Sequence, residues 1–101
     1  ASVAISTRGP EGLDSALAKM SSMGDVRGAA VDVADGDALA AWVAASGAAM
    51  GGLDIIVSNA SGGGAGKTSA EAFHRTLNVD VLGLVRMGEA GQEMLESSDC
   101  A

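Results

Sequence analysis

Residues 53–62 read Leu-Asp-Ile-Ile-Val-Ser-Asn-Ala-Ser-Gly, and this stretch decides the fold that the sequence predicts. Its first six residues are mainly apolar, a pattern typical of a strand that helices cover on both faces of a parallel sheet. Asn59 follows directly, and a glycine-rich loop comes next. Because open α/β sheets bind their ligands outside the carboxyl ends of the strands, this stretch predicts a ligand-facing loop.

Helices and strands are expected to alternate before this run. One strand is predicted over residues 3–7 and another over residues 26–33, each followed by a helical pattern. Asp35 is placed to cap the second helix, and Gly51 is placed to end it. With the strand at 53–58, this alternation indicates an α/β fold whose parallel strands are joined by right-handed crossovers.

A third and long helix is predicted after the glycine-rich loop. Thr68 and Glu71 have the spacing of a capping box, which marks its beginning. Apolar and small residues then recur at intervals of three and four, namely Phe73, Leu77, Val81, Leu84, Gly88, Gly91 and Leu95. This spacing predicts one narrow packed face along the helix, which on the simplest interpretation covers the sheet.

The composition limits the partners and the compartment. The chain has 101 residues and a net charge of −7, which argues against nucleic acid and anionic membranes as partners. Cys100 is the only cysteine, so no internal disulfide can form and a reducing compartment is expected. The sequence has neither a membrane-spanning apolar run nor a signal-peptide pattern, and we expect a cytoplasmic protein.

The stretch at 53–62 resembles the Asn-Asn-Ala-Gly segment of the short-chain dehydrogenase/reductase family, with Ser58 and Ser61 in place of two of its usual residues. Residues 73–83, Phe-His-Arg-Thr-Leu-Asn-Val-Asp-Val-Leu-Gly, are similar to the family's next helix. The resemblance implies a partial Rossmann-like doubly wound parallel sheet over residues 1–101, with three strands alternating with three helices. It also implies an oxidoreductase that transfers hydride between NADP(H) and a carbonyl or alcohol substrate.

The resemblance further implies an incomplete enzyme. The chain has no Tyr and opens inside a strand pattern without an initiator Met, so we expect a segment of a longer protein. It lacks the family's first strand with its Gly-rich turn, and it ends before the Ser, Tyr and Lys of the catalytic group. Since that first strand would lie between the strands at 3–7 and 53–58, the isolated segment is expected to be poorly stable or to self-associate.

Several residues are implied to bind the cofactor. Arg8 follows the strand predicted at 3–7, at the place where a carboxylate would hold the ribose hydroxyls of NAD, so NADP(H) is favoured over NAD(H). The resemblance implies that Asp32 and Val33 lie against the adenine ring. The loop residues implied to line the cofactor path are Asn59, Ala60, Ser61 and Gly62. Each has a structural alternative: a solvated arginine, a strand-end aspartate, or ordinary turn residues.

The resemblance assigns Asn78 to the family's Asn-Ser-Tyr-Lys catalytic group, where it helps to hold a water molecule near the lysine. The alternative is an exposed asparagine in a helix. His74 has no carboxylate or cysteine at ligand spacing, so no metal site is expected. In the family the last helix packs against its copy in a neighbouring subunit. A homo-oligomer is therefore expected, and a non-catalytic oligomerising segment remains an alternative function.

A rival motif overlaps the loop. Residues 61–68 read Ser-Gly-Gly-Gly-Ala-Gly-Lys-Thr, which matches a phosphate-binding P-loop except at Ser61. Backbone amides of such a loop hold phosphates, and Lys67 would reach them. The motif follows the third predicted strand rather than the first, and no later strand ends in an acidic residue for magnesium. Nucleoside triphosphate binding therefore stands as the second interpretation.

Overall fold

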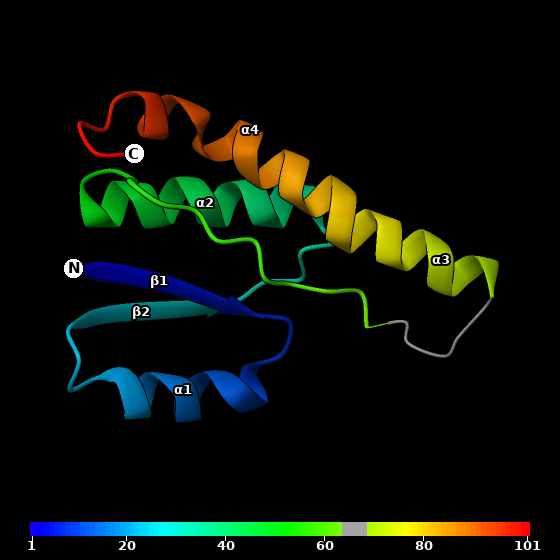
Figure 1. Ribbon diagram of the computed structural model, residues 1–101. Helices are drawn as coiled ribbons and strands as arrows, with labels where there is room; N and C mark the ends of the chain where they lie inside the picture. Colours follow the sequence, from blue (N-terminus) through cyan, green and yellow to red (C-terminus); the bar gives the residue numbers. More distant parts are fainter. Residues whose placement is uncertain (64–68) are drawn as a thin grey trace. The chain divides into compact units, whose positions relative to one another are not determined.

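The computed structural model describes residues 1–63 and 69–101 (Figure 1). The chain divides into two compact units, Ala1–Asp32 and Val33–Ala101, which we call the first and the second unit.

The first unit is a strand–helix–strand motif. Strand β1 (Ser2–Thr7) is followed by a 3₁₀ turn (Pro10–Gly12), helix α1 (Leu13–Met20) and strand β2 (Asp25–Ala30). The strands pair in parallel, with Ser2 opposite Asp25 and Thr7 opposite Ala30. A parallel pair needs a crossover connection, and α1 supplies it, as the sequence predicts.

Helix α2 (Gly36–Met50) opens the second unit, with the cap and the stop that the sequence predicts. The Asp35 carboxylate accepts a hydrogen bond from the Ala38 amide at 3.0 Å, and Gly51 ends the helix in the left-handed conformation. The buried face of α2 is made of Leu39, Val43, Ser46 and Gly47. Leu39 is completely buried and is the centre of this core.

The last helical stretch is long, as predicted, but it is not uniform. It consists of α3 (Ala70–Thr76), the π-helical segment η2 (Leu77–Leu82) and α4 (Gly83–Glu96). Thr68, the predicted cap, lies outside the described residues; the Ser69 hydroxyl instead accepts from the Ala72 amide at 3.2 Å. In Figure 1, α2 and α4 lie side by side and run in the same direction.

The predicted packed face of this helix is wrong over most of its length. Phe73 is 63% exposed, and Leu77, Val81, Leu84 and Gly88 are exposed as well. The buried residues are instead Val79, Gly83, Met87 and Gly91, spaced by four. Because η2 follows an i→i+5 pattern, the face that begins in α3 does not continue along the line that α-helical spacing projects.

The predicted third strand is also wrong. Residues 53–58 form no strand, and in the described part of the chain no backbone hydrogen bond joins them to another segment. Ile55 and Val57 are 75% and 76% exposed, whereas Leu53 and Ile56 lie against Gly91 of α4. A strand exists only through its hydrogen-bonded neighbour, and this run has none in the described residues.

Candidate cofactor site

Arg8 and Asp32 lie at one edge of the first unit. Arg8 directly follows β1 and is exposed, and Asp32 comes two residues after β2. Because the strands are parallel, both residues follow carboxyl ends at the same edge. The Val31 amide donates to the Thr7 carbonyl at 2.8 Å, which extends the pairing beyond the last strand residue. A cation and a carboxylate are thus held by a regular backbone scaffold.

The loop of residues 59–63 belongs to the second unit. Asn59, Ala60 and Ser61 are exposed, and Gly62 is half-buried. The Gly62 amide donates to the Asp80 carboxylate at 2.7 Å, and the Gly63 amide donates to the Ser61 hydroxyl at 3.4 Å. Side-chain oxygens of this chain therefore already accept hydrogen bonds from two successive loop amides.

Gly62 is placed where a side chain would not fit. A Cβ atom on this residue would lie 2.7 Å from the Thr76 Cα and 3.1 Å from its hydroxyl oxygen. The Thr76 hydroxyl itself donates to the Ala72 carbonyl at 2.9 Å, within the same turn of helix. Glycine at position 62 lets the loop backbone touch the helix directly.

The sequence left open that Asn78 is simply an exposed asparagine in a helix, and the structure does not have it so. It is half-buried in η2, and its amide nitrogen donates to the Ala34 carbonyl at 3.2 Å. Its side-chain oxygen accepts from the Arg86 guanidinium at 3.1 Å, and Arg86 also donates to Ala34 at 3.4 Å. The Asn78 backbone carbonyl accepts from the Gly83 amide, which is a π-helical bond. Asn78 thus joins the segment that leads into α2 to the last helix.

Val33, the other residue expected to contact the adenine ring, is half-buried in the second unit. Its side chain lies against Gly83 at the start of α4. The structure therefore brings Val33, Ala34 and Asn78 to one region, where η2 meets the segment that precedes α2. Residues 59–62 contact η2 through Asp80, two positions further along.

Asp80 and Arg86 are the two site residues that the sequence analysis did not single out. The resemblance gives neither of them a role, and their partners are 18 and 52 residues away in the chain. The available signal was indirect: polar residues at 78, 80 and 86 interrupt an apolar helix. Because helical residues two apart do not face each other, 78 and 80 had to serve different neighbours.

Asp25 is a titratable group whose environment is clearly perturbed, and it lies at the opposite edge of the strand pair. A hydrogen bond from Ser2, followed by one from the Arg27 guanidinium, lowers the pKa of the Asp25 carboxyl. Arg27 contacts the Asp25 carboxylate at 2.6 Å on the surface. Asp25 begins β2, whereas Asp32 follows its other end. This pair therefore bears on stability and not on the candidate site.

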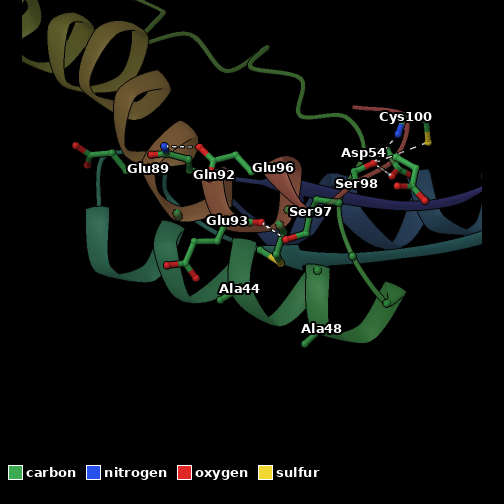
Figure 2. Close-up of a pocket in the computed structure, with 17 residues that line it drawn as sticks. Ala44, Ala48, Asp54, Glu89, Gln92, Glu93, Glu96, Ser97, Ser98 and Cys100 are labelled. Atoms are coloured by element: carbon green, nitrogen blue, oxygen red, sulfur yellow. Dashed lines mark hydrogen bonds between the residues drawn. The ribbon is translucent and has the colours of Figure 1, made fainter.

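A groove of the second unit lies away from the candidate site (Figure 2). It has a volume of about 1080 Å³ and lies between the carboxyl-terminal halves of α2 and α4. Its lining includes none of the predicted site residues but several carboxylates, among them Asp54, Glu89, Glu93, Glu96 and Asp99. A groove with this charge repels a phosphate-bearing ligand.

Two features are absent from the part of the chain that the structure describes. Residues 1–63 and 69–101 contain no group of three or more His, Cys, Asp or Glu side chains that could hold a metal ion. Within the same residues, no helix has the length and apolar character needed to cross a bilayer.

Comparison with known proteins places this geometry in a family. A family profile described as enoyl-(acyl carrier protein) reductase matches residues 1–100. No curated protein matches the chain. The chain is similar to a double mutant of a short-chain dehydrogenase/reductase from Serratia marcescens, with 25% identity and a TM-score of 0.79, covering 93% of this chain and 40% of that one.

A second solved structure supports the same assignment. A short-chain dehydrogenase from Burkholderia cenocepacia J2315, solved in complex with NADP, is 27% identical with a TM-score of 0.81. The match again covers 93% of this chain and 40% of the other, so the chain spans well under half the length of both structures. The predicted fold class, a partial Rossmann-like α/β fold, is thereby confirmed. Together with the profile match, which covers nearly every residue, these similarities show that the chain belongs to the short-chain dehydrogenase/reductase family.

Proposed function

We propose that the protein containing this chain is an NADP(H)-dependent oxidoreductase acting on a carbonyl or alcohol carbon. Residues 1–101 would form part of its dinucleotide-binding domain. The bound nicotinamide would supply the hydride, and this chain would bind and orient the cofactor. The residues outside this segment would supply the proton transfer, so the chain by itself is expected to be inactive.

The position of Arg8 is the observation that carries the choice of NADP(H). Its exposed guanidinium follows β1 immediately, and β1 ends in Ser6 and Thr7 without a carboxylate. A guanidinium at this position suits a 2′-phosphate, whereas a carboxylate would suit free ribose hydroxyls. The NADP bound to the Burkholderia cenocepacia structure is consistent with this choice at the level of the family.

Two further groups are proposed to hold the remainder of the cofactor. Asp32 and Val33 would contact the adenine ring, and the loop residues Asn59, Ala60, Ser61 and Gly62 would line the path toward the nicotinamide. Asn78 is proposed as a member of the catalytic group. Its side chain bonds Ala34 and Arg86, which would hold it in one orientation.

Titration of the full-length protein with NADPH and NADH tests the assignment. Arg8→Ala should raise the Kd for NADPH about tenfold or more and leave the Kd for NADH nearly unchanged, because only NADPH carries the phosphate. Lys19→Ala removes an equal charge from the exposed surface of α1 and serves as the control. Equal effects of Arg8→Ala on both cofactors would contradict the proposed phosphate contact.

The P-loop interpretation has weaker support. The Gly62 amide donates to a carboxylate, so the loop presents a negative group where a triphosphate would need donors. Lys67 and its neighbours at 64–68 lie outside the described residues. Titration of the full-length protein with ATP–magnesium discriminates the two interpretations, and binding of ATP without binding of NADPH would favour the P-loop.

We propose that the protein is a homo-oligomer through its last helix. Several apolar side chains of this helical stretch are exposed, namely Phe73, Leu77, Val81, Leu82, Leu84 and Val85. Large apolar side chains that are exposed together along one helical stretch are a feature of interaction surfaces. Their exposure also keeps open the alternative of a non-catalytic oligomerising segment, which a hydride-transfer assay on the full-length protein distinguishes.

The mass of the full-length protein in solution tests the oligomer. Leu84→Glu should lower the mass measured by light scattering, because a carboxylate would then be buried without a partner. Met23→Glu alters an exposed apolar residue of the first unit and serves as the control. A mass that Leu84→Glu leaves unchanged would exclude this surface as the interface.

The remaining proposals concern location and other partners. We propose a cytoplasmic protein that acts on a small molecule and binds no nucleic acid. The single exposed cysteine, Cys100, supports the reducing compartment, and the net charge of −7 argues against binding to nucleic acid.

A further inference from the structure

The Arg86 side chain of α4 is bonded to the segment that leads into α2. Its Nη1 donates to the Ala34 carbonyl at 3.4 Å and to the Asn78 side-chain oxygen at 3.1 Å. The Asn78 amide nitrogen donates to the same Ala34 carbonyl at 3.2 Å. Each of the three groups is thus bonded to the other two. One backbone carbonyl, 44 and 52 residues away in the chain, is the acceptor that both side chains share.

Gly36, the first residue of α2, adds a second contact with Arg86. A Cβ atom on Gly36 would lie 2.9 Å from both Cδ and Nε of Arg86 and 3.0 Å from its Cζ. The guanidinium end of the side chain therefore lies directly against the Gly36 backbone, where glycine leaves room for it. Between Ala34 and Gly36 is Asp35, whose carboxylate caps α2 through the Ala38 amide. Arg86 thus contacts the residues on either side of the helix cap.

The contacts of Arg86 are hydrogen bonds to neutral groups rather than ion pairs. Asp35, Asp37 and Glu89 line the same groove as Arg86. Among the described residues, however, no carboxylate forms an ion pair with it. The guanidinium donates instead to a carbonyl and to an amide oxygen. Because a guanidinium is planar and carries its donors in a rigid arrangement, it can hold two acceptors at fixed places.

The bonded carbonyl of Ala34 is one residue after Val33. Val33 is half-buried, and its side chain lies against Gly83. Since Val33 is proposed to contact the adenine ring, the conformation of this segment matters for cofactor binding. We infer that Arg86 is a positioning residue, which holds residues 33–36 in the conformation that receives the adenine half of the cofactor. The inference rests on the proposed function and adds to it a residue that acts through this segment rather than on the ring.

Hydrogen exchange measured by mass spectrometry on the full-length protein tests the hold on this segment. The Ala38 and Leu39 amides report on it, because they donate to the Asp35 carboxylate and carbonyl at 3.0 Å. In Arg86→Met, which keeps an unbranched stem but removes the donors, the peptide with these amides should exchange about threefold faster or more. Lys19→Met removes an equal charge from the exposed surface of α1 and should leave this peptide unchanged.

Binding of the two halves of NADPH tests the consequence. A segment that adopts the receptive conformation about one-third to one-tenth as often binds its ligand about three- to tenfold more weakly. Arg86→Met should therefore raise the Kd for NADPH, and for its adenine half 2′,5′-ADP, by about this factor. The Kd for the other half, reduced nicotinamide mononucleotide, should change less than about twofold, because that half would not contact residues 33–36. A general loss of folded protein would reduce the binding of all three ligands alike.

Two further variants separate hydrogen bonding from charge and from folding. Arg86→Lys keeps the charge, but its nitrogen ends one bond short of the position of Nη1, so it should be nearly as defective as Arg86→Met. Gly36→Ala places a methyl group against the Arg86 side chain and should displace it without removing a donor. It should raise the same two Kd values. Because alanine suits a helix better than glycine, Gly36→Ala tests the inference even where Arg86→Met does not fold.

The outcomes separate this inference from the proposed function. Unchanged exchange in both Arg86→Met and Gly36→Ala overturns the hold on the segment. Faster exchange with unchanged affinity for the adenine half overturns the positioning role, as does an equal loss of affinity for the nicotinamide half. Wild-type affinity in Arg86→Lys overturns the hydrogen-bonding role. Wild-type protein that binds neither NADPH nor its adenine half would instead refute the proposed function, whereas the exchange measurement would still decide whether Arg86 holds the segment.

Discussion

Residues 2–7 and 53–58 are two runs of the same length, of which only the first forms a strand. The first is strand β1, each of whose residues has a parallel partner in β2. The second has no hydrogen-bonded backbone neighbour in the described residues and leaves Ile55 and Val57 about three-quarters exposed. Apolar residues are common to both runs. The difference is that β1 has a neighbouring strand to which its backbone is hydrogen-bonded. A strand is stable only when it is paired in this way.

The run at 53–58 is nevertheless held in place on one side. Leu53 and Ile56 lie against Gly91 of α4, and the Asp54 carboxylate accepts from the Ser98 hydroxyl at 2.5 Å. These are side-chain contacts, and they come from α4 and the residues that follow it. The run therefore depends on the helices of the second unit for its position, whereas β1 depends on β2.

The largest effect should come from the buried core of the second unit, whose helix α4 contacts this run. Leu39→Ala opens a cavity at the completely buried centre of α2 and should cost about 2–5 kcal/mol of unfolding free energy. Urea unfolding followed by circular dichroism measures it. Leu39→Met, which nearly conserves the volume, should cost less than about 1.5 kcal/mol. A loss below about 1 kcal/mol for alanine would mean that the helix pair has no well-packed core.

The next largest effect should be a difference in unfolding free energy between substitutions on the two sides of this run. Ile56→Ala should cost about 1–3 kcal/mol, since the half-buried side chain packs on α4. Ile55→Ala and Val57→Ala should each stay within about 0.5 kcal/mol, because both side chains are in water. Urea unfolding of the 101-residue chain distinguishes these results, and equal costs at positions 55 and 56 would show that the run is paired in solution.

Local signals in the sequence were sufficient for the helices and for the first unit. The Asp35 cap, the Gly51 stop and the parallel pairing of β1 with β2 all follow from residues close together in the chain. The strand at 53–58 was mispredicted because an apolar pattern indicates only that both faces of a segment are covered by other residues. It does not indicate that a neighbouring strand is present to form backbone hydrogen bonds. For the candidate cofactor site, the residues named from the sequence stay predictions, and no local signal indicates that Asp80 would reach Gly62.

Helix α4 has two glycines that differ in the same way: Gly83 lies against another side chain, and Gly88 has open space beside it. Gly83→Ala would drive a methyl group into the Val33 side chain and should cost about 1–3 kcal/mol. Gly88 has open space where its side chain would be, so Gly88→Ala should stabilise the chain by up to about 1 kcal/mol through helix propensity. Thermal unfolding measures both. A stabilising Gly83→Ala would show that α4 lies further from Val33 than the structure has it.

The π-helical segment explains why the buried face of the last helix could not be projected from its start. Spacings of three and four lead from Phe73 to Leu77, Val81 and Leu84, which are all exposed. The face that packs begins at Val79 and continues through Gly83. Asn78 and Asp80 of this segment bond residues 44 and 18 positions away in the chain, and no local propensity indicates such contacts.

The smallest effect is expected at the amino-terminal end of the paired run, where Asp25 faces Ser2. The Ser2 hydrogen bond and the Arg27 guanidinium lower the pKa of Asp25 below its ordinary value of 3.8. A lowered pKa in the folded state means that the unfolded chain binds the proton more tightly. The contribution to stability is therefore fully present above pH 3.8 and disappears as the pH falls through the folded-state pKa.

Asp25→Asn removes this contribution and should lower the Tm slightly at about pH 6, with a difference from wild type that vanishes in strong acid. Because the pair is exposed, solvent and salt screen it, and the difference should also shrink at high ionic strength. Scanning calorimetry from about pH 2 to about pH 6 follows both trends. A difference that persists unchanged at the acid end would show that Asp25 acts through a contact other than its charge.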